Sequence, residues 1–571
     1  MLCTRKFFWE TLQYGLVLSI LFPFITPQKW SYVTMFGASN WLIAATVALA
    51  TAIYWISKAL YMRLRFRGLP QPPKHSWIWA HTTIWEETAA KLPPFTHPQH
   101  VYTYLAQKYN MPGIFYVDMW PFVESQVVIT DPDAAQLVLT TNPYPKHPTI
   151  EKFLRPFTGP DSIAASNGER WKYNHRMVGS GFTPTYVKPM AGMIAEQVLI
   201  FHERLKGFAE SGEPFNMEEE AAKTVFDVIG KVVFGFSLEA QTTGSPLLED
   251  LRASINPATT FISTRNPWKK RKAEKGLQAL RDRVRKTLAD EMNERLRILQ
   301  DEKELPSRRQ VKSVLDRIVL DRIQSGPGAT LDDAFIDTAV TNLKALLLGG
   351  HGTTTDTFTW VAMLLSLYPD VVARLREEHD AHFSPDLDTT VQLLVANPTI
   401  TNDLAFTNAV IKETLRFFPI GFTIRQAPPG VTHLTWNGRR WPVKNLMVVP
   451  CAHSTHMDPG VWGQDSKFFR PDRFLGDEAR ETHRFAWRPF ERGPRACIAQ
   501  DLAMDELRIM MLLTVRWFDF ETVVGGGGGT SERVMYMDLD SRVGDLAFQM
   551  VGMEARPRHD MKMKVKLREG K

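Results

Sequence analysis

A cysteine near the C-terminal end of the chain carries the strongest chemical signal. Cys497 follows a tight Gly493-Pro494 loop, stands two residues after Arg495, and is followed by a helical pattern from residue 500. A thiol at a helix N-terminus meets unpaired backbone N–H groups and the positive end of the helix dipole, and both favour the thiolate. Such a thiolate is a candidate axial iron ligand, with Arg495 placed to meet an anionic group of the same cofactor. The alternative is a buried structural cysteine, which is what most lone cysteines are.

The loop around Cys497 has the spacing Phe-x-x-Gly-x-Arg-x-Cys-x-Ala, beginning at Phe490. This spacing resembles the haem-binding loop of the cytochromes P450. The resemblance implies haem b as the cofactor, contacted by Phe490, Gly493 and Arg495 and held by the Cys497 thiolate, which favours O–O cleavage. It also implies the cytochrome P450 fold, which is mainly α with small β-sheets (α+β).

A second motif lies inside a helical pattern over residues 331–367, which ends before Pro369. A helix of about 37 residues is about 55 Å long and can cross a whole domain. Its middle reads Gly349-Gly350-His351-Gly352-Thr353-Thr354-Thr355-Asp356. Three glycines inside a helix cost about 2–3 kcal/mol relative to alanine. Close approach of a flat cofactor, with Gly350 as a contact, would offset that cost; a glycine patch for helix packing is the alternative.

This segment resembles the family's Ala/Gly-Gly-x-Asp/Glu-Thr-Thr motif. By that match Thr353 is the threonine that hydrogen-bonds dioxygen and helps to deliver protons, with Thr354 beside it. The acidic position of the motif is occupied by Gly352. Asp356 is four residues further on the same helix face, and His351 is adjacent. Either residue, or water, could replace the missing carboxylate.

Two further segments predict a scaffold behind the cysteine loop. Glu413 and Arg416 are three residues apart on a helical pattern, and Arg473 follows in a Phe-Arg-Pro-Asp-Arg-Phe segment. These residues resemble the family's Glu-x-x-Arg and Pro-x-Arg-Phe pair, which implies a buried ion triad. Arginine suits such a site because its planar group bonds a carboxylate in two places.

Haem carries two carboxylates that require cationic partners. The segment beginning at Trp171 resembles the family's Trp-x-x-x-Arg, but His175 occupies the arginine position and Arg176 follows it. The charge of His175 would depend on pH. Arg425 resembles a second propionate-binding arginine, and Arg495 is a third cation. Trp171 is equally compatible with a core aromatic.

The N-terminal region predicts a membrane anchor. Residues 7–25 are nearly all apolar apart from Glu10, and residues 41–56 are mostly apolar without any charged residue. A spanning helix needs about 20 apolar residues, so the second run is the better candidate, and one or two helices are possible. Arg63, Arg65 and Arg67 follow, which places the rest of the chain in the cytosol. A cleaved secretory signal is the alternative.

The composition bounds the class of protein. The 571 residues include 68 basic and 62 acidic side chains, and a net charge of +6 is too mild to argue for nucleic acid. The three cysteines are far apart, which fits a reducing compartment. Without an internal repeat or a long linker, we expect a membrane anchor over residues 1–62, a basic and proline-rich hinge over 63–75, and one catalytic domain over 76–571.

Periodicity predicts the elements that position these residues. Six helices are expected over residues 132–141, 185–208, 217–236, 276–304, 331–367 and 404–418, the first with Asp131 as N-cap. Strand-like runs cover residues 113–117, 126–129 and 446–449, and a five-glycine run at 525–529 reads as a surface loop.

Together the motifs predict a haem-thiolate monooxygenase in the endoplasmic reticulum membrane. By the resemblance, its electrons come from NADPH through cytochrome P450 reductase, with cytochrome b5 as an optional donor. The substrate is expected to be a lipophilic molecule, namely a terpenoid or polyketide intermediate of fungal specialised metabolism, which is hydroxylated, epoxidised or desaturated. An O₂-independent haem-thiolate isomerase or dehydratase is one alternative, which Gly352 supports, and a membrane haem sensor or carrier is the other.

Overall fold

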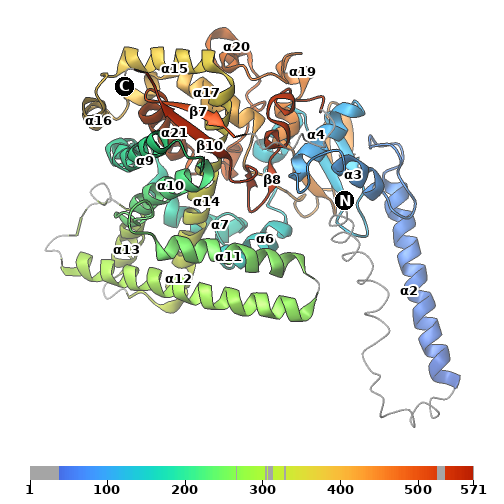
Figure 1. Ribbon diagram of the computed structural model, residues 1–571. Coiled ribbons are helices and arrows are strands. Elements are labelled where there is room, and N and C mark those ends of the chain that lie inside the picture. The colour runs from blue at the N-terminus through green and yellow to red at the C-terminus, as the bar shows by residue number, and fades with distance from the viewer. Residues whose placement is uncertain are drawn as a thin grey trace.

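The computed structural model describes residues 38–264, 266–301, 305–306, 311, 313–326, 330–523 and 534–569, with side chains omitted at 38–42 and 263. Most of this chain is helical, and the helices surround a few small sheets (Figure 1). The first apolar run, residues 7–25, and the five-glycine run lie outside the described residues. The family fold that the motifs predict is the one observed.

The described helices comprise one N-terminal helix and the helices of the body. In chain order the first group is α2 (Ala38–Arg65), α3 (Thr82–Ala89), α4 (Pro98–Lys108), α5 (Pro132–Gln136), α6 (Pro148–Thr158), α7 (Gly168–Gly179), α8 (Pro184–Val187), α9 (Ala191–Ser211), α10 (Met217–Phe234), α11 (Pro246–Ser263) and α12 (Pro267–Asp301). The second group is α13 (Val314–Gln324), α14 (Asp333–Leu367), α15 (Pro369–His382), α16 (Leu387–Ala396), α17 (Ala405–Phe417), α18 (Ala452–His456), α19 (Pro459–Trp462), α20 (Gly476–Glu481), α21 (Gln500–Val515) and α22 (Asp540–Val543).

Within the described residues the strands form four small sheets. A three-stranded sheet has the order β1 (Ile114–Val117), β2 (Gln126–Ile129), β6 (Met447–Pro450), with β1 and β2 antiparallel and β2 and β6 parallel. A second has the order β3 (Phe215–Asn216), β10 (Lys562–Leu567), β7 (Phe518–Thr522). Two antiparallel hairpins pair β4 (His433–Trp436) with β5 (Arg439–Pro442) and β8 (Met550–Val551) with β9 (Ala555–Arg556).

The helix α14 is the central element of the core. Its N-cap Asp332 accepts a hydrogen bond from the Phe335 N–H at 2.8 Å, and Pro369 follows its C-terminal end. Most of its residues from Ile336 to Leu365 are buried, which explains why its sequence is apolar on several faces. The Trp360 ring stacks on Phe418 at the end of α17, with centroids 3.9 Å apart. Helix α14 therefore packs against the end of α17.

Five of the six predicted helices are observed, although α12 begins at Pro267 and not at residue 276 as predicted. The sixth, over residues 185–208, is divided into α8 and α9 by a short 3-10 turn at Lys188–Met190. The Asp131 side chain accepts from Ala134 N–H as predicted, but α5 ends at Gln136 and continues as a π-helical turn, Leu137–Thr141. The three predicted strands correspond to β1, β2 and β6.

Helix α2 projects from the body of the molecule (Figure 1). Its segment Ile43–Arg65 is 23 residues long with a mean hydropathy of 1.5, which is long and apolar enough to cross a membrane. The end of α2 is fixed to the domain, because the Arg63 guanidinium is buried and forms an ion pair with Asp118 at 2.5 Å. Arg63 therefore belongs to the helix and the domain rather than to a hinge beginning at residue 63, and it is not a free interfacial cation.

Candidate active site

A cavity of about 340 Å³ is lined on different sides by α14 and the cysteine loop. Cys497, Phe490 and Arg495 contribute from the loop, and Gly350 and Thr353 contribute from the helix. Apolar side chains from other elements complete much of the wall: Ile163, Phe182, Ile229, Leu346, Leu415, Ile420 and Leu502. The fold thus brings the two predicted chemical motifs to one space.

Backbone contacts fix the cysteine loop before α21 begins. The Cys497 N–H donates to the Phe490 carbonyl at 2.8 Å, and the Ala496 N–H donates to the Gly493 carbonyl at 3.0 Å. Gly493 has φ of +76°, and a Cβ there would lie 2.8 Å from the Thr140 hydroxyl and overlap the Leu139 carbonyl oxygen. Glycine is therefore required at position 493 for the loop to pack on the π-helical turn.

The Cys497 thiol is exposed on the cavity wall but enclosed by protein at longer range. Burial raises the pKa of this thiol, while the Ala499 N–H and the positive charge of Lys146 act in the opposite direction. The Ala499 N–H favours the thiolate as expected, but desolvation has the larger effect and raises the pKa of the thiol. Coordination to a metal ion would deprotonate the thiol outright.

Two cations lie at the edge of the cavity. The Arg495 guanidinium lies over the Trp171 ring, 4.7 Å from its centroid, and donates to the Ser166 carbonyl at 2.9 Å. Lys146 also lines the cavity, and burial together with Arg425 lowers its pKa to about 7. Trp171 thus supports an arginine at the cavity edge, so it is more than a core aromatic.

The other two predicted propionate partners are arranged differently. His175 lines the cavity, but burial and the charge of Arg495 lower its pKa, so it is a weak cation at neutral pH. Arg425 is 1% exposed and its Nη2 lies 3.5 Å from the Glu491 carboxylate, while its Nε is buried without a hydrogen-bond partner among the described residues. Arg176 is exposed and faces outward.

The threonines of α14 donate hydrogen bonds along their own helix. The Thr353 hydroxyl donates to the Gly349 carbonyl at 2.7 Å and also lines the cavity. Thr354 lines the same cavity and is hydrogen-bonded to Glu506 of α21, whose pKa burial raises to about 8. Helix α14 stays a continuous α-helix through the motif.

The surroundings of the three glycines of the motif differ from one position to the next. A Cβ on Gly349 would meet nothing within 4 Å, and this residue faces the cavity. A Cβ on Gly350 would lie 2.8 Å from Cδ1 of Ile229 on α10, so its absence allows two helices to approach. A Cβ on Gly352 would overlap the carboxylate of Glu554. Gly349 and Gly350 both line the cavity and fit the expectation of an approaching cofactor, whereas the space beside Gly352 is occupied by Glu554.

The two residues expected to replace the missing acid differ sharply. The His351 ring lies edge-on to Phe226 of α10, and burial lowers its pKa to about 3, so it cannot be a proton donor near neutral pH. Asp356 is 2% exposed, and burial and nearby carboxylates raise its pKa well above its usual value. Asp356 is thus the better proton-holding group of the two.

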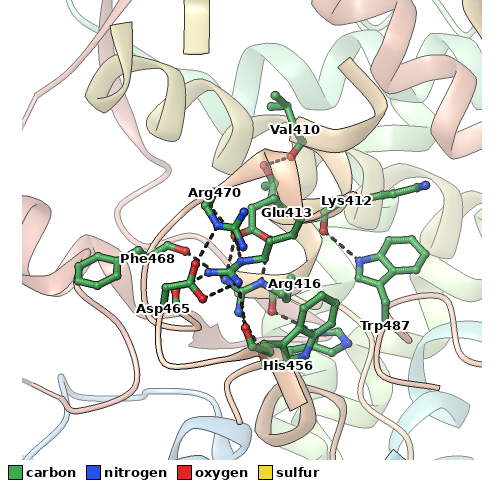
Figure 2. A network of polar contacts seen from close by, with 12 residues as sticks. Val410, Lys412, Glu413, Arg416, His456, Asp465, Phe468, Arg470 and Trp487 are labelled. Carbon is green, nitrogen blue, oxygen red and sulfur yellow. Dashed lines mark hydrogen bonds and ion pairs between the residues drawn. The ribbon is translucent and has the colours of Figure 1, made fainter. Parts of the chain in front are cut away.

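The predicted ion triad is brought together by the fold, and Figure 2 shows Glu413 beside Arg416. Arg416 donates to both oxygens of the Glu413 carboxylate at 2.7 and 2.8 Å, and Arg473 Nε lies 3.4 Å from the same group. All three side chains are at most 1% exposed. The Arg470 N–H adds a further donor to Glu413 at 2.9 Å. The carboxylate is therefore fully compensated despite its burial.

A histidine connects this network to the cysteine loop. His456 Nδ1 donates to the Arg416 carbonyl at 3.1 Å, and its Nε2 accepts from the Arg488 N–H at 3.0 Å. The Trp487 indole donates to the Lys412 carbonyl of α17 at 2.9 Å (Figure 2). The triad thus determines where the chain enters the loop that ends at Cys497.

Comparison with known proteins agrees with this geometry. The model of the family Cytochrome P450 matches residues 70–534. The chain belongs to the cytochrome P450 family. Among its relatives is cytochrome P450 monooxygenase acrF of Aspergillus aculeatus, 30% identical over 522 residues that cover 84% of this chain and 99% of that protein.

More distant relatives support the same assignment. Cytochrome P450 monooxygenase polC of Polytolypa hystricis is 27% identical, over 84% of this P450 and 86% of the relative. Human cytochrome P450 4F2 is 25% identical, over 86% and 92% of the two chains. The crystal structure of the cytochrome P450DA heme domain has the same fold, with a TM-score of 0.67 at 18% identity, covering 88% of this chain and 97% of that one. The protein is a P450 monooxygenase.

The residues present fit the haem that the family implies. The Cys497 thiol opens on the cavity, the unpaired Arg425 Nε is buried near it, and Arg495 and Lys146 are at its edge. Cys497 would hold the iron, and these cations would meet the propionates. When bound, haem supplies the activation of oxygen, and the protein supplies position and electrostatics.

Sequence reasoning missed three ionisable residues of the P450 site. Lys146 and Glu506 line the cavity, and Glu554 lies against Gly352. Glu506 follows Cys497 by nine residues on the helix behind the loop, a spacing that could have been noticed. Lys146 and Glu554 had no local signal, since each reaches its place only through the tertiary fold.

Proposed function

We propose that this P450 oxidises a lipophilic small molecule and that a terpenoid or polyketide intermediate of specialised metabolism is its substrate. The observation that carries the proposal is the Cys497 thiol on the wall of a largely apolar cavity that Thr353 also lines. An apolar wall with few polar groups favours a ligand of the same character. The similarity to acrF and polC, which are named as fungal P450 monooxygenases, supports this class of chemistry.

Within this proposal, Thr353 holds and passes a proton at the distal side of the cavity. Its hydroxyl can donate into the cavity once it releases the Gly349 carbonyl, because a hydroxyl rotates freely. Thr354 helps to fix the helix through Glu506. The O₂-independent alternative depended on a distal helix without a nearby carboxylate, and the position of Glu554 against Gly352 weakens that argument.

The properties of α2 support a membrane location. The helix is long and apolar, and its side chains are mostly exposed, so it is not a core helix. We propose that α2 anchors the enzyme in the endoplasmic reticulum membrane, with the catalytic domain facing the cytosol. Lipophilic substrates that partition into the membrane would then be concentrated near the cavity.

Electrons are proposed to come from NADPH through cytochrome P450 reductase, with cytochrome b5 as a second donor. On the side of the cysteine loop, burial and the charge of Arg484 lower the pKa of Arg492, and burial, Arg508 and Arg492 lower the pKa of Lys412. A cluster of cations suits an acidic partner surface.

The test uses the full-length protein with a P450 reductase. Candidate terpenoid and polyketide intermediates would be supplied, and products that require both NADPH and O₂ would be identified by mass spectrometry. The reduced protein should also show the red-shifted carbon monoxide absorption of thiolate ligation. Cys497→Ser should abolish both results, whereas Cys451→Ser, at a buried cysteine remote from the cavity wall, should keep them.

Two outcomes would refute the proposal. Absence of the thiolate absorption in well-folded protein would exclude the haem-thiolate centre. Product formation without NADPH or O₂ would favour an isomerase or dehydratase.

A further inference from the structure

The acidic position missing from α14 is filled by a side chain from elsewhere in the chain. Gly352 is buried, and a Cβ on it would lie 2.9 Å from Cδ of Glu554 and overlap a carboxylate oxygen. Any side chain at position 352 would therefore displace Glu554 from its observed position. The carboxylate occupies the space into which an aspartate at 352 would extend.

The hairpin that carries Glu554 is tied to the cavity wall. The Ala555 N–H donates to the carbonyl of Ile420, which lines the cavity, at 3.2 Å. The Val551 N–H donates to the Phe95 carbonyl at 2.8 Å, and the Gln549 side chain donates to the Ala555 carbonyl at 2.9 Å. Both strands of the hairpin are thus held, and Glu554 has a defined place beside α14.

Glu554 belongs to a group of three carboxyls with too few cations. Asp356 lies one turn after Gly352 on the same helix face, and Glu218 lies in the first turn of α10. The charged neighbours are Arg556, Arg252 and Asp560, of which Asp560 is hydrogen-bonded to Glu218. Asp356 Oδ2 and Glu218 Oε2 are buried without a hydrogen-bond partner among the described residues.

The electrostatic consequence is that this group retains protons. Burial and the adjacent carboxylates raise the pKa of Glu554 to about 7 and that of Glu218 to about 7, and Arg556 opposes both shifts. The same causes raise the pKa of Asp356 well above its usual value. Like charges in a shared buried site cannot all ionise, so a proton is available here near neutral pH.

We propose that Glu554 serves as the distal carboxyl group of this enzyme, holding a proton for the Thr353 hydroxyl in place of the side chain that Gly352 lacks. This role rests on the proposed monooxygenase function. Through water, the protonated carboxyl gives its proton to Thr353 Oγ1, and Thr353 passes its own hydroxyl proton into the cavity. The resulting carboxylate lies beside Arg556 and regains a proton from solvent. Asp356 and Glu218 set the proton affinity of the group.

The first experiment is an infrared pH titration of the haem-loaded, full-length protein without substrate. The wild type should show a protonated carboxyl band that disappears as the pH rises through about 7. Glu554→Gln should remove about one carboxyl's share of this band, while Glu210→Gln, on the exposed end of α9, should leave it unchanged. A band that is unaltered in Glu554→Gln, or no carboxyl titrating above pH 6 in the wild type, would overturn the proposal.

The second experiment removes the carboxyl at position 554 on the hairpin and introduces one at position 352 on α14. With reductase and NADPH, Glu554→Ala should slow O₂-dependent NADPH oxidation about tenfold, below the full effect of a general acid because Asp356 and Glu218 remain. The double variant Gly352→Asp/Glu554→Ala should recover to within about twofold of wild type, and Gly352→Ala/Glu554→Ala should not. Equal rates in the two double variants would refute the proton-holding role.

Failure of this inference is distinguishable from failure of the proposed function. Loss of the thiolate carbon monoxide spectrum in the wild type would contradict the monooxygenase itself. A normal spectrum with no response of the carboxyl band to Glu554→Gln would contradict only the role of Glu554.

Discussion

The two charged clusters of this P450, one on each side of the cavity, are built on opposite principles. On the proximal side, one carboxylate, Glu413, meets two guanidinium groups and a backbone N–H. On the distal side, three carboxyls share the charge of Arg556 and Arg252, and several of their polar atoms have no partner among the described residues.

The difference separates a structural cluster from a functional one. A buried charge with all its partners has one stable protonation state and one geometry, so it fixes the position of the cysteine loop. A buried group with more carboxyls than cations keeps a proton. Its pKa is near neutral pH, and a group with such a pKa can both give and regain a proton. The following changes would break or sharpen this contrast, beginning with the largest expected effect.

Arg416→Ala should cost about 3–5 kcal/mol of unfolding free energy, because it leaves the Glu413 carboxylate buried without its bidentate partner. The variant should also lose haem, since the Arg416 guanidinium donates to the His456 carbonyl at 2.7 Å and the His456 ring accepts from the Arg488 N–H just before the cysteine loop. Urea unfolding and the haem-to-protein ratio measure the two effects. Normal haem content in this variant would contradict a structural role for the triad.

Gly350→Ala should cost about 1–2 kcal/mol, because the new methyl group meets Ile229 of α10 at 2.8 Å. In Ile229→Ala/Gly350→Ala the loss should be smaller than the sum of the two single losses. Gly349→Ala, where the methyl group would meet no neighbour, should instead gain about 1 kcal/mol from helix propensity. Equal destabilisation of Gly349→Ala and Gly350→Ala in urea unfolding would refute these separate roles.

Glu554→Gln should change how stability depends on pH. The pKa of Glu554 is raised to about 7 in the folded protein, above its unfolded value near 4.5, so the folded state binds more protons between these values. Stability from this group is therefore present at low pH and lost as the pH rises through 7. The wild type should lose about 1–2 kcal/mol relative to Glu554→Gln between pH 5 and 8.

Urea unfolding midpoints at the two pH values would measure this change. Glu210→Gln is the control, and its difference from the wild type should be the same at both pH values. A difference between wild type and Glu554→Gln that does not vary with pH would show that Glu554 ionises normally.

Arg374→Ala should have the smallest effect, at most about 1 kcal/mol. Arg374 bonds both oxygens of Asp472 at 2.9 and 2.8 Å, like Arg416 on Glu413, but both side chains are nearly half exposed. Added salt should reduce the effect further. A loss as large as that of Arg416→Ala would mean that burial is not what distinguishes the two pairs.

Much of this architecture could be predicted because it depends on residues close in sequence. The N-cap Asp131, the long apolar pattern of α14 and the Glu413–Arg416 spacing are local signals, and each leads to an observed element or contact. Some boundaries differ from the prediction. The π-helical turn after α5 packs against Gly493 of the cysteine loop, which is distant in sequence, whereas the break before α9 contains Pro189, a local signal.

The sequence by itself determined the family, the cysteine that would hold the iron and the helix that faces it, because those motifs have fixed spacing within single elements. Only the tertiary structure decided the protonation chemistry around them. Desolvation raises the pKa of Cys497 against the helix terminus, and Glu554 takes the space beside Gly352. Both outcomes depend on burial and on contacts between residues far apart along the chain, and the local spacing of residues does not reveal either of these.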